Sequence, residues 1–410
     1  GISNYDYIQF LNLAYSTSST DASYPILGTS PIVRVSPTGT LVAYDRTWEK
    51  LETENIGLDF GLLKRRLSGS FDYFWKRNGN MLLSRTYSAQ MGANAPSGNN
   101  GDLSVWGWDF SMNWRDKVGE LSYNLGFNIS DSQNKLVNFG GQNLISSANR
   151  GFNSAVEGYP INSYFGLVYD GRIQTQEQLD NYRKYITGNN IGMPSGVATA
   201  QSNSRLALGD NMFKDVNGDG KITFPEDAVY LGTDNPRYSY SVNGGLQFKG
   251  FDFSFILQGV GKRTIVRDGN WRIPAAVIFQ AQNAAFLDQW WTPERTNANL
   301  PRISSTGTIN NYNYFPSDWV AEDGSYLRLK NLVVGYTIPK AITQKAKIER
   351  LRVYFSGNDL YEFSKIKDGW DPEAPRTVSN AGDSNNLNVS TTSQRFPFYR
   401  YFTFGVNLTF

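Results

Sequence analysis

The residues between Asp215 and Glu226 have the types and spacing of a calcium-binding loop. The segment reads DVNGDGKITFPE and fits the calcium-loop pattern at every required position. Ca²⁺ is a hard cation that binds about six to eight oxygen atoms. Asp215, Asn217, Asp219 and Glu226 would supply side-chain oxygens, and Lys221 would supply its backbone carbonyl. The spacing therefore predicts a bound Ca²⁺ ion.

An alternative interpretation of the same residues needs no metal. Asp and Asn side chains also accept hydrogen bonds from nearby backbone N–H groups and so form tight Asx turns. Neither flank of the loop has a strong helical pattern, so the sequence does not predict a paired EF-hand. In either case the loop lies within a long connection, residues 131–236, which it would hold in shape.

Five aromatic residues form a second set of candidate binding residues. An exposed aromatic ring can stack on the C–H face of a sugar, because one side of a sugar is apolar. The alternative is that these rings pack against their own loops. The candidates are Trp290, Trp291, Tyr312, Tyr314 and Trp319.

The composition excludes much enzyme chemistry. The 410 residues include no Cys and no His, so they cannot form a disulfide, a thiolate metal site or a Ser–His nucleophile. The acidic pair Glu226 and Asp227 lies in the calcium-type loop, where a glycosidase role is not expected. With 39 Lys plus Arg against 37 Asp plus Glu, no nucleic-acid partner is expected either. We therefore expect a protein that is not an enzyme.

Alternation of apolar and polar residues is the dominant pattern and predicts nine strands. One face of these strands is rich in Trp, Tyr and Phe, whereas the other carries Asn, Ser, Asp, Gln and Gly. In the last strand the apolar face comprises Phe402, Phe404, Val406, Leu408 and Phe410. This strand resembles the terminal strand that outer-membrane assembly machinery recognises, and we expect Phe410 to be the end of the protein.

Short links between the strands alternate with long ones. The long links run from about Arg77 to Asp102, Ser130 to Arg237, Gly261 to Ser325 and Tyr361 to Tyr399. A soluble β-sandwich would show the same alternation of residues, but links beyond about 12–15 residues are uncommon in compact domains. Short turns on one side and long loops on the other are typical of outer-membrane barrels. The sequence therefore predicts an all-β fold, a transmembrane antiparallel β-barrel with long extracellular loops.

An odd number of strands predicts an incomplete barrel, because complete bacterial barrels have an even number. If Phe410 lies on the periplasmic side, the alternation of links places residues 1–46 outside the cell. The chain begins at Gly1 without a signal peptide, so we expect it to belong to a longer protein. These residues alone should not close a barrel.

Several segments resemble the C-terminal portion of the SusC/RagA family of TonB-dependent transporters. One of them is GSYLRLKNLVVGYTIPK. The similar stretches occur in the family's order at 47–83, 157–179, 213–259, 324–340 and 351–365, followed by the final strand. The resemblance implies that the whole chain, 1–410, is part of a barrel of about twenty-two strands, with the plug and the TonB box lying elsewhere.

The resemblance also implies a function. Members of this family import large nutrients, usually glycans and sometimes peptides, across the outer membrane of Bacteroidota. We therefore expect a TonB-energised importer whose partners are a SusD-like surface lipoprotein, the TonB complex, outer-membrane lipid and LPS, and a glycan or peptide substrate. The alternative is a surface glycan-binding or adhesive β-protein without transport.

Overall fold

The structure, a computed structural model, describes most of the chain after residue 45. Residues 11–16 and 32–37 are described as backbone strands, β1 (Leu11–Ser16) and β2 (Ile32–Pro37), which pair antiparallel. The other described ranges are 46–84, 97–141, 143–145, 154–186, 206–266, 286–304, 312–366, 370–373 and 399–410. The expectation that residues 1–46 lie outside the cell falls mostly outside the described residues.

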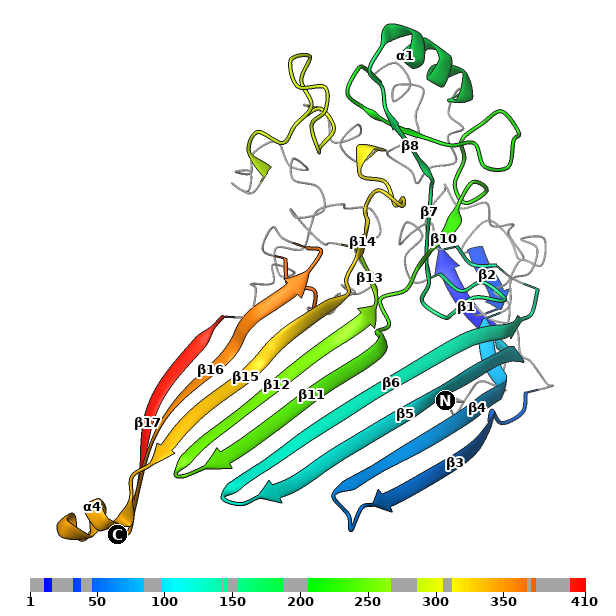
Figure 1. The fold of residues 1–410 in the computed structure, drawn as a ribbon. Coiled ribbons are helices and arrows are strands. Elements are labelled where there is room, and N and C mark those ends of the chain that lie inside the picture. Colours follow the sequence, from blue (N-terminus) through cyan, green and yellow to red (C-terminus); the bar gives the residue numbers. More distant parts are fainter. Residues whose placement is uncertain are drawn as a thin grey trace.

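Nine antiparallel strands form the main sheet (Figure 1), which confirms the number that the alternation predicts. Their order in space is β17-β16-β15-β12-β11-β6-β5-β4-β3. The strands are β3 (Lys50–Leu62), β4 (Leu67–Ser84), β5 (Ser97–Val118), β6 (Leu121–Phe139), β11 (Arg237–Phe248), β12 (Phe251–Lys262), β15 (Tyr326–Thr337), β16 (Arg350–Ser364) and β17 (Tyr401–Thr409).

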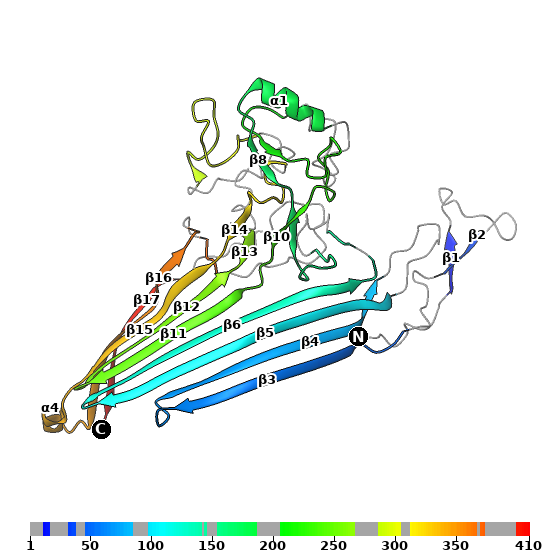
Figure 2. The same ribbon diagram turned by 45° about the vertical axis from the view of Figure 1, so that its right-hand side comes forward.

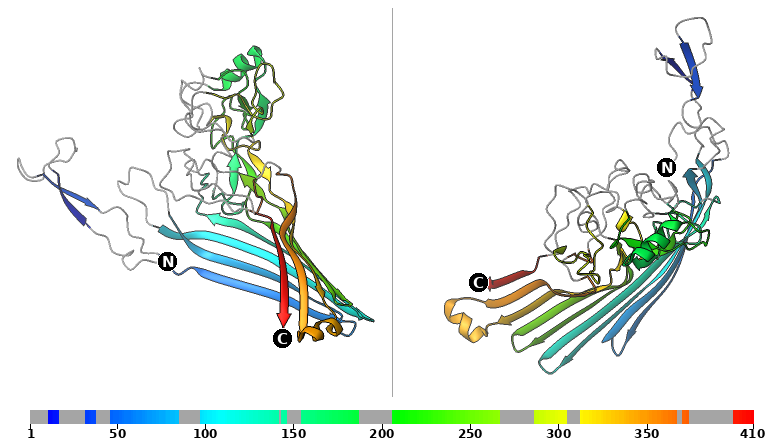
Figure 3. Two further views of the ribbon diagram at one scale, coloured as in Figure 1. Left: turned by 90° about the vertical axis from the view of Figure 1, so that its left-hand side faces the viewer. Right: turned by 90° about the horizontal axis from the view of Figure 1, so that it is seen from above.

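The sheet is curved and open (Figures 2 and 3), as part of a barrel wall would be. Its two edges are β3 and β17, and within the described residues no pairing joins them. The expectation that these residues do not close a barrel alone is therefore confirmed. Strands of 9 to 22 residues are long enough for a bilayer, which a tilted strand crosses in about 9–11 residues.

Tight turns join the strands at one end of the sheet. Lys249 and Gly250 link β11 to β12 with φ angles of 47° and 87°, the left-handed pair that a two-residue hairpin turn requires. A Cβ atom at Gly250 would lie 2.7 Å from the carbonyl oxygen of Thr337, so a glycine is needed there for space as well. The link between β15 and β16 holds α4 (Lys340–Thr343) and η5 (Gln344–Ala346).

At the opposite end the strands run further than the apolar alternation predicts. β4 continues to Ser84 and β5 begins at Ser97, so their link spans 85–96 rather than the expected stretch from Arg77 to Asp102. β6 continues to Phe139, and the long connection is therefore 140–236 instead of 131–236. The reason is physical: ladder hydrogen bonds join backbone groups and do not require the apolar side chains that mark a strand in the sequence.

Short elements make up the long links. Three two-stranded ladders pair β7 with β10, β8 with β9 and β13 with β14. Thr175 caps the seven-residue helix α1 through a capping box with Gln178, as a T-x-x-Q sequence predicts. Among the described residues, no helix is long and apolar enough to cross a membrane. The bounds are β7 (Tyr164–Gly166), β8 (Tyr169–Arg172), α1 (Gln176–Tyr182), η2 (Arg183–Tyr185), β9 (Asn211–Phe213), β10 (Val229–Gly232), β13 (Thr264–Val266) and β14 (Ala321–Asp323).

Candidate functional site

A row of polar side chains crosses eight strands of the main sheet at one height. Residues directly opposite each other on neighbouring strands point to the same face of a sheet. The hydroxyl oxygens of Ser70 and Ser111 are 2.8 Å apart and share a hydrogen bond within this row. We call this side of the sheet the polar face. The row is Asp59, Ser70, Ser111, Asn128, Ser241, Gln258, Arg328 and Glu362.

The other side of the sheet, the apolar face, carries rows of large apolar side chains. One such row is open to solvent to differing degrees: Val334 is 43% exposed and Phe404 is 81% exposed, whereas Tyr123, Phe253 and Phe355 are half-buried. A contiguous exposed apolar surface of this kind marks contact with lipid or with another protein. The row is Tyr123, Leu246, Phe253, Val334, Phe355 and Phe404.

The terminal-strand residues lie where the alternation places them. Phe402, Phe404, Val406 and Leu408 share the apolar face of β17 with their partners on β16. Phe410 follows the strand and is 84% exposed. Recognition of these residues by assembly machinery remains a prediction.

An ion pair on the polar face joins Arg352 of β16 to Asp252 of β12. The Nε atom of Arg352 lies 2.9 Å from Oδ1 of Asp252, although the two residues belong to strands that are not neighbours. The pair reaches across β15 at Gly335, where a Cβ atom would lie 2.5 Å from the guanidinium and 2.6 Å from the carboxylate. Gly335 therefore leaves the space that the pair occupies.

Two of the long links fold together into one compact unit. We define the loop body as residues 164–186, 206–228, 286–304 and 312–320, which lie beyond the long-link end of the sheet (Figure 1). Its core combines apolar residues from the β6–β11 link with others from the β12–β15 link. The core residues are Leu167, Ile173, Leu179, Tyr182, Ile186, Leu206, Phe213, Ile222, Phe224, Tyr312 and Phe315.

A buried carboxylate joins these segments at the centre of the loop body. Asp210 is fully buried, and both of its oxygens lie 2.9 Å from the guanidinium of Arg302. Asn313 donates its side-chain N–H to the same carboxylate at 2.9 Å, and so does the backbone N–H of Ala207. Burial raises the pKa of the Asp210 carboxyl, and Arg302 and Asn313 oppose that rise by stabilising the charged form.

Two buried tyrosines continue this network. The backbone N–H of Phe213 donates to the hydroxyl of Tyr182 at 2.9 Å, and Tyr312 donates to the carbonyl of Asn211 at 3.0 Å. The two hydroxyl oxygens are 2.6 Å apart, so Tyr182 must donate to Tyr312. Burial is the main cause that raises the pKa of Tyr182 and of Tyr312. The hydrogen-bond chain starts and ends on β9 and fixes that strand against α1.

A buried arginine ties another segment to the loop body. Arg172 donates from its guanidinium to the carbonyls of Ala298 and Asn299, at 2.6 and 3.1 Å. It also donates to the side chain of Asn211 at 3.3 Å. Burial of the guanidinium lowers the pKa of Arg172.

The predicted aromatic residues lie mostly inside the loop body. Trp290 and Tyr314 pack in one apolar cluster with Trp319, whose ring centroid is 5.5 Å from that of Tyr314. Trp291 is 7% exposed and donates its ring N–H to Gln174 at 2.9 Å, while Tyr312 belongs to the main core. A stacked sugar needs an open ring face. The burial therefore favours packing over sugar stacking for these residues.

The calcium-type loop is shaped by its own hydrogen bonds. Asp215 accepts the N–H groups of Gly218 and Gly220 at 2.7 and 2.8 Å, and Asp219 accepts that of Lys221 at 2.8 Å. Asn217 accepts the N–H of Asp219 at 2.9 Å. Thr223 donates its hydroxyl to Glu226 at 2.7 Å.

These bonds agree with the Asx-turn interpretation and leave further lone pairs on each carboxylate. In the part of the chain that the structure describes, no three acidic side chains converge closely enough to hold a metal ion. A bound Ca²⁺ would therefore require the acidic side chains of the loop to move closer together.

Asp227 is a structural residue of this loop that the motif does not include. Its side chain is fully buried and accepts the N–H groups of Val216, Asn217 and Thr223 at 2.8, 3.2 and 2.6 Å. The carboxylate thus closes the loop from inside, while Ile222 anchors it in the core. An aspartate next to the last motif position gives no signal in the sequence for such a role. The network of Asp210, Arg302 and Asn313 gives none either, because Asp210 is 92 and 103 residues away from its two partners in the sequence.

Comparisons with known proteins agree with this architecture. The chain is 30% identical over 374 residues to TonB-dependent receptor P3 of Formosa agariphila, covering 88% of this chain and 34% of that protein. It is 26% identical over 348 residues to TonB-dependent receptor SusC of Bacteroides thetaiotaomicron, covering 80% and 30%. No family profile matches the sequence.

A solved structure shares the fold. The RagAB peptide importer in its open-open state superposes with a TM-score of 0.63 at 18% identity, covering 100% of this chain and 38% of the matched chain. The chain thus spans about a third of the length of the relatives it matches in sequence. The sequence relatives, the shared fold and the two-faced sheet together place the chain in the SusC/RagA family of TonB-dependent receptors.

Proposed function

We propose that this chain forms part of the wall and the extracellular loops of an outer-membrane importer for a bulky hydrophilic solute. The observation that carries the proposal is the division of the main sheet into two faces. The apolar face suits lipid and LPS, whereas the polar row presents hydroxyl, amide and carboxylate groups to a wet lumen. The loop body then lies on the extracellular side, at the end of the sheet where the long links emerge.

The solute class that we propose is a glycan or an oligopeptide. Both carry many hydrogen-bonding groups, and the polar row offers donors and acceptors across eight strands. Relatives of the chain are named TonB-dependent receptors, and RagAB is named a peptide importer. The TonB-dependent names support energy supply by the TonB complex. The SusD-like lipoprotein that would close over the loops rests on the resemblance to the SusC/RagA family.

An adhesive surface protein is the competing hypothesis. Its binding surface would be the loop body, and it would need only an inert wall. The polar row argues against it, because a wall without a transport path does not need hydrogen-bonding side chains from β3 to β16. The loop body alone does not separate the two functions.

A gene deletion in the native host tests the proposal. Loss of the gene should abolish growth on one oligomeric or polymeric nutrient and spare growth on its monomer, and the wild-type gene should restore growth. Purification in mild detergent should yield a lipoprotein in near-equal amount. A protein that purifies alone, and whose loss changes only surface attachment, would support the adhesin instead.

We also propose that Ca²⁺ binds the loop 215–226 of the folded protein. Asp215, Asn217, Asp219 and Glu226 would hold the ion together with the carbonyl of Lys221. The proposal is supported by the motif and by the free lone pairs on the carboxylates, which the hydrogen bonds of the loop already orient. The ion would stiffen the loop body and would take no part in moving the solute.

A further inference from the structure

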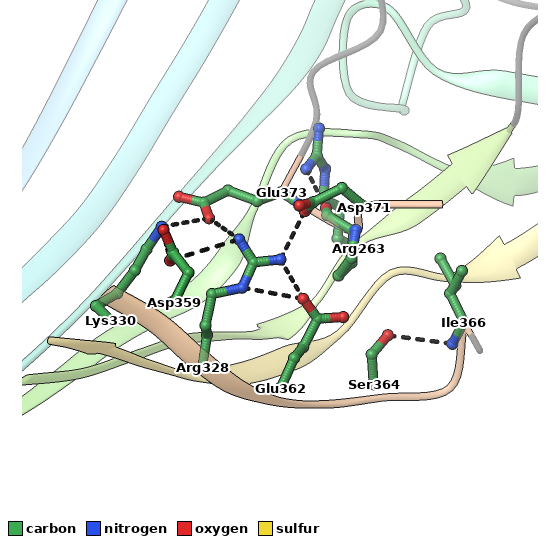
Figure 4. A network of polar contacts seen from close by, with 10 residues as sticks. Arg263, Arg328, Lys330, Asp359, Glu362, Ser364, Ile366, Asp371 and Glu373 are labelled. Atoms are coloured by element: carbon green, nitrogen blue, oxygen red, sulfur yellow. Dashed lines mark hydrogen bonds and ion pairs between the residues drawn. The ribbon is translucent and has the colours of Figure 1, made fainter. Parts of the chain in front are cut away.

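One arginine of the polar row is hidden from solvent. Arg328 is 3% exposed, whereas Asp59, Asn128 and Gln258 in the same row are exposed. The difference arises because residues 370–373, which follow β16 in the sequence, lie over Arg328 (Figure 4). We call Trp370–Glu373 the strap.

Charged side chains hold the strap to β15. The Nη2 and Nη1 atoms of Arg328 lie 2.7 Å from Asp371 Oδ1 and from Glu373 Oε2, respectively. The ammonium group of Lys330 lies 2.7 Å from the same Glu373 oxygen. In addition, Arg263 donates to the carbonyl of Pro372 at 2.8 Å.

The sheet supplies carboxylates of its own to the same two cations. Glu362 accepts from Nε of Arg328 at 2.9 Å, and Asp359 lies 3.2 Å from the ammonium group of Lys330. Within the described residues the cluster therefore places two carboxylates of the sheet and two of the strap around Arg328 and Lys330 (Figure 4). The carboxylates of the sheet and the strap repel one another, and the two cations that they share offset that repulsion.

The apolar end of the strap is packed as well. Trp370 is 6% exposed and forms a cluster with Ile265 and Ile366, which are 5% and 7% exposed. This contact lies next to the ion cluster along the chain. Of the contacts described above, release of the ions would leave this small apolar cluster and the hydrogen bond from Arg263 to the carbonyl of Pro372.

We propose that the strap is a latch on the polar face, closed by Arg328 and Lys330 and opened as a unit when its ion pairs break. Closed, it covers part of the polar row and narrows the path along that face. After opening, Arg328 keeps Glu362 and Lys330 keeps Asp359, so neither cation is left without a carboxylate. The latch concerns the position of the strap and does not depend on the proposed import.

Labelling of an introduced thiol tests the latch. Because the chain has no Cys, Ile366→Cys places one reporter thiol in the apolar cluster beside the strap. The full protein is purified in detergent, and the rate of maleimide labelling is measured on the peptide that contains position 366. Adding Asp371→Ala with Glu373→Ala should raise the rate about tenfold or more, because buried charge pairs are then lost on the strap side alone.

The matched control is Arg352→Gln, which breaks an ion pair on the same face that involves no loop residue. It should leave the labelling rate unchanged. Arg328→Gln should raise the rate as the strap-side variant does; if it does not fold, the strap-side variant decides alone. Equally slow labelling with and without the strap carboxylates would overturn the proposal. So would a rise of the same size in the Arg352→Gln control.

Discussion

The main sheet and the loop body bury their side chains in opposite ways. On the sheet the largest apolar side chains point outwards, and Phe404 is 81% exposed. In the loop body they point inwards, and Phe315 is fully buried. The same residue type thus has opposite environments within one chain. In water, large apolar side chains are mostly buried, and the loop body follows this rule. The sheet reverses it because its outer face meets lipid, so the burial of a residue has to be judged against the solvent of its own region.

The two regions also differ in what connects them internally. The sheet depends on backbone ladders between strands that mostly follow each other in sequence. The loop body depends on side-chain bonds between distant segments, such as the pair of Asp210 and Arg302. We therefore expect the loop body to unfold locally while the sheet persists, because side-chain networks fail when one member is removed.

Removal of the central carboxylate should have the largest effect and should separate the two regions. Asp210→Ala leaves the partly buried guanidinium of Arg302 without this acceptor. Because loss of one partner of a buried pair costs about 3–5 kcal/mol, the loop body should be destabilised by up to that amount. Hydrogen exchange at β9 should become fast, while exchange in the strands of the main sheet should stay slow. The matched control is Asp170→Ala, since Asp170 is exposed and its one ion pair among the described residues is a 3.6 Å contact with Lys214. Equal loosening of the sheet would show that the two regions are one unit.

Two adjacent valines test the faces of the sheet. Val334 lies on the apolar face, and Val333 lies on the polar face between Ser254 and Ser356. An Arg on the lipid side of a barrel costs ~2–4 kcal/mol at the bilayer midplane and less towards the interfaces. Val334→Arg should therefore destabilise the sheet more than Val333→Arg, because the second side chain meets water. Stability in lipid vesicles is followed by the loss of the folded band in gels. Equal costs at the two positions would contradict the assignment of the faces.

The sequence predicts the sheet far better than it predicts the loop body. Alternation at positions such as Phe402, Phe404 and Val406 reports the face directly, because strand geometry has a period of two. No such period links Asp210 to Asn313, which meet only after two links have folded. Strand ends were also missed, for example at Phe139, because ladder bonds continue past the apolar residues. The calcium motif can be recognised in the sequence because its residues lie within twelve consecutive positions. The buried residue Asp227, which closes the loop, belongs to no known sequence pattern.

Calcium should strengthen the loop body and leave the sheet unchanged. If the ion binds, free Ca²⁺ at about ten times its Kd should stabilise the loop body by about 1.4 kcal/mol. Protease should then cut the 140–236 link more slowly with Ca²⁺ than with chelator, and Asp215→Ala should remove the difference. The control variant Asp180→Ala changes an exposed residue of α1 and should keep the difference between digestion with Ca²⁺ and with chelator. Equal digestion in both conditions would contradict Ca²⁺ binding and support the metal-free Asx turn.

The smallest expected effect comes from the buried tyrosine pair, and it depends on pH. Burial raises the pKa of Tyr182 above its ordinary value of 10.0. A group whose pKa is raised by folding contributes stability that is complete below its unfolded pKa and is lost as the pH rises above it. Tyr182→Phe removes one buried hydrogen-bonding hydroxyl and should cost the loop body about 1 kcal/mol at pH 8.

That cost should shrink between about pH 10 and pH 11, because the wild type loses stability with rising pH and the variant loses less. The urea midpoint of the loop body, followed by tryptophan fluorescence at both pH values, measures the difference. Tyr185→Phe is the matched control, since Tyr185 is 42% exposed and only three residues away. A cost for Tyr182→Phe that stays constant up to pH 11 would mean that the hydroxyl pair is open to water. The contrast between a lipid-facing sheet and a water-excluding loop body would then be smaller than the structure indicates.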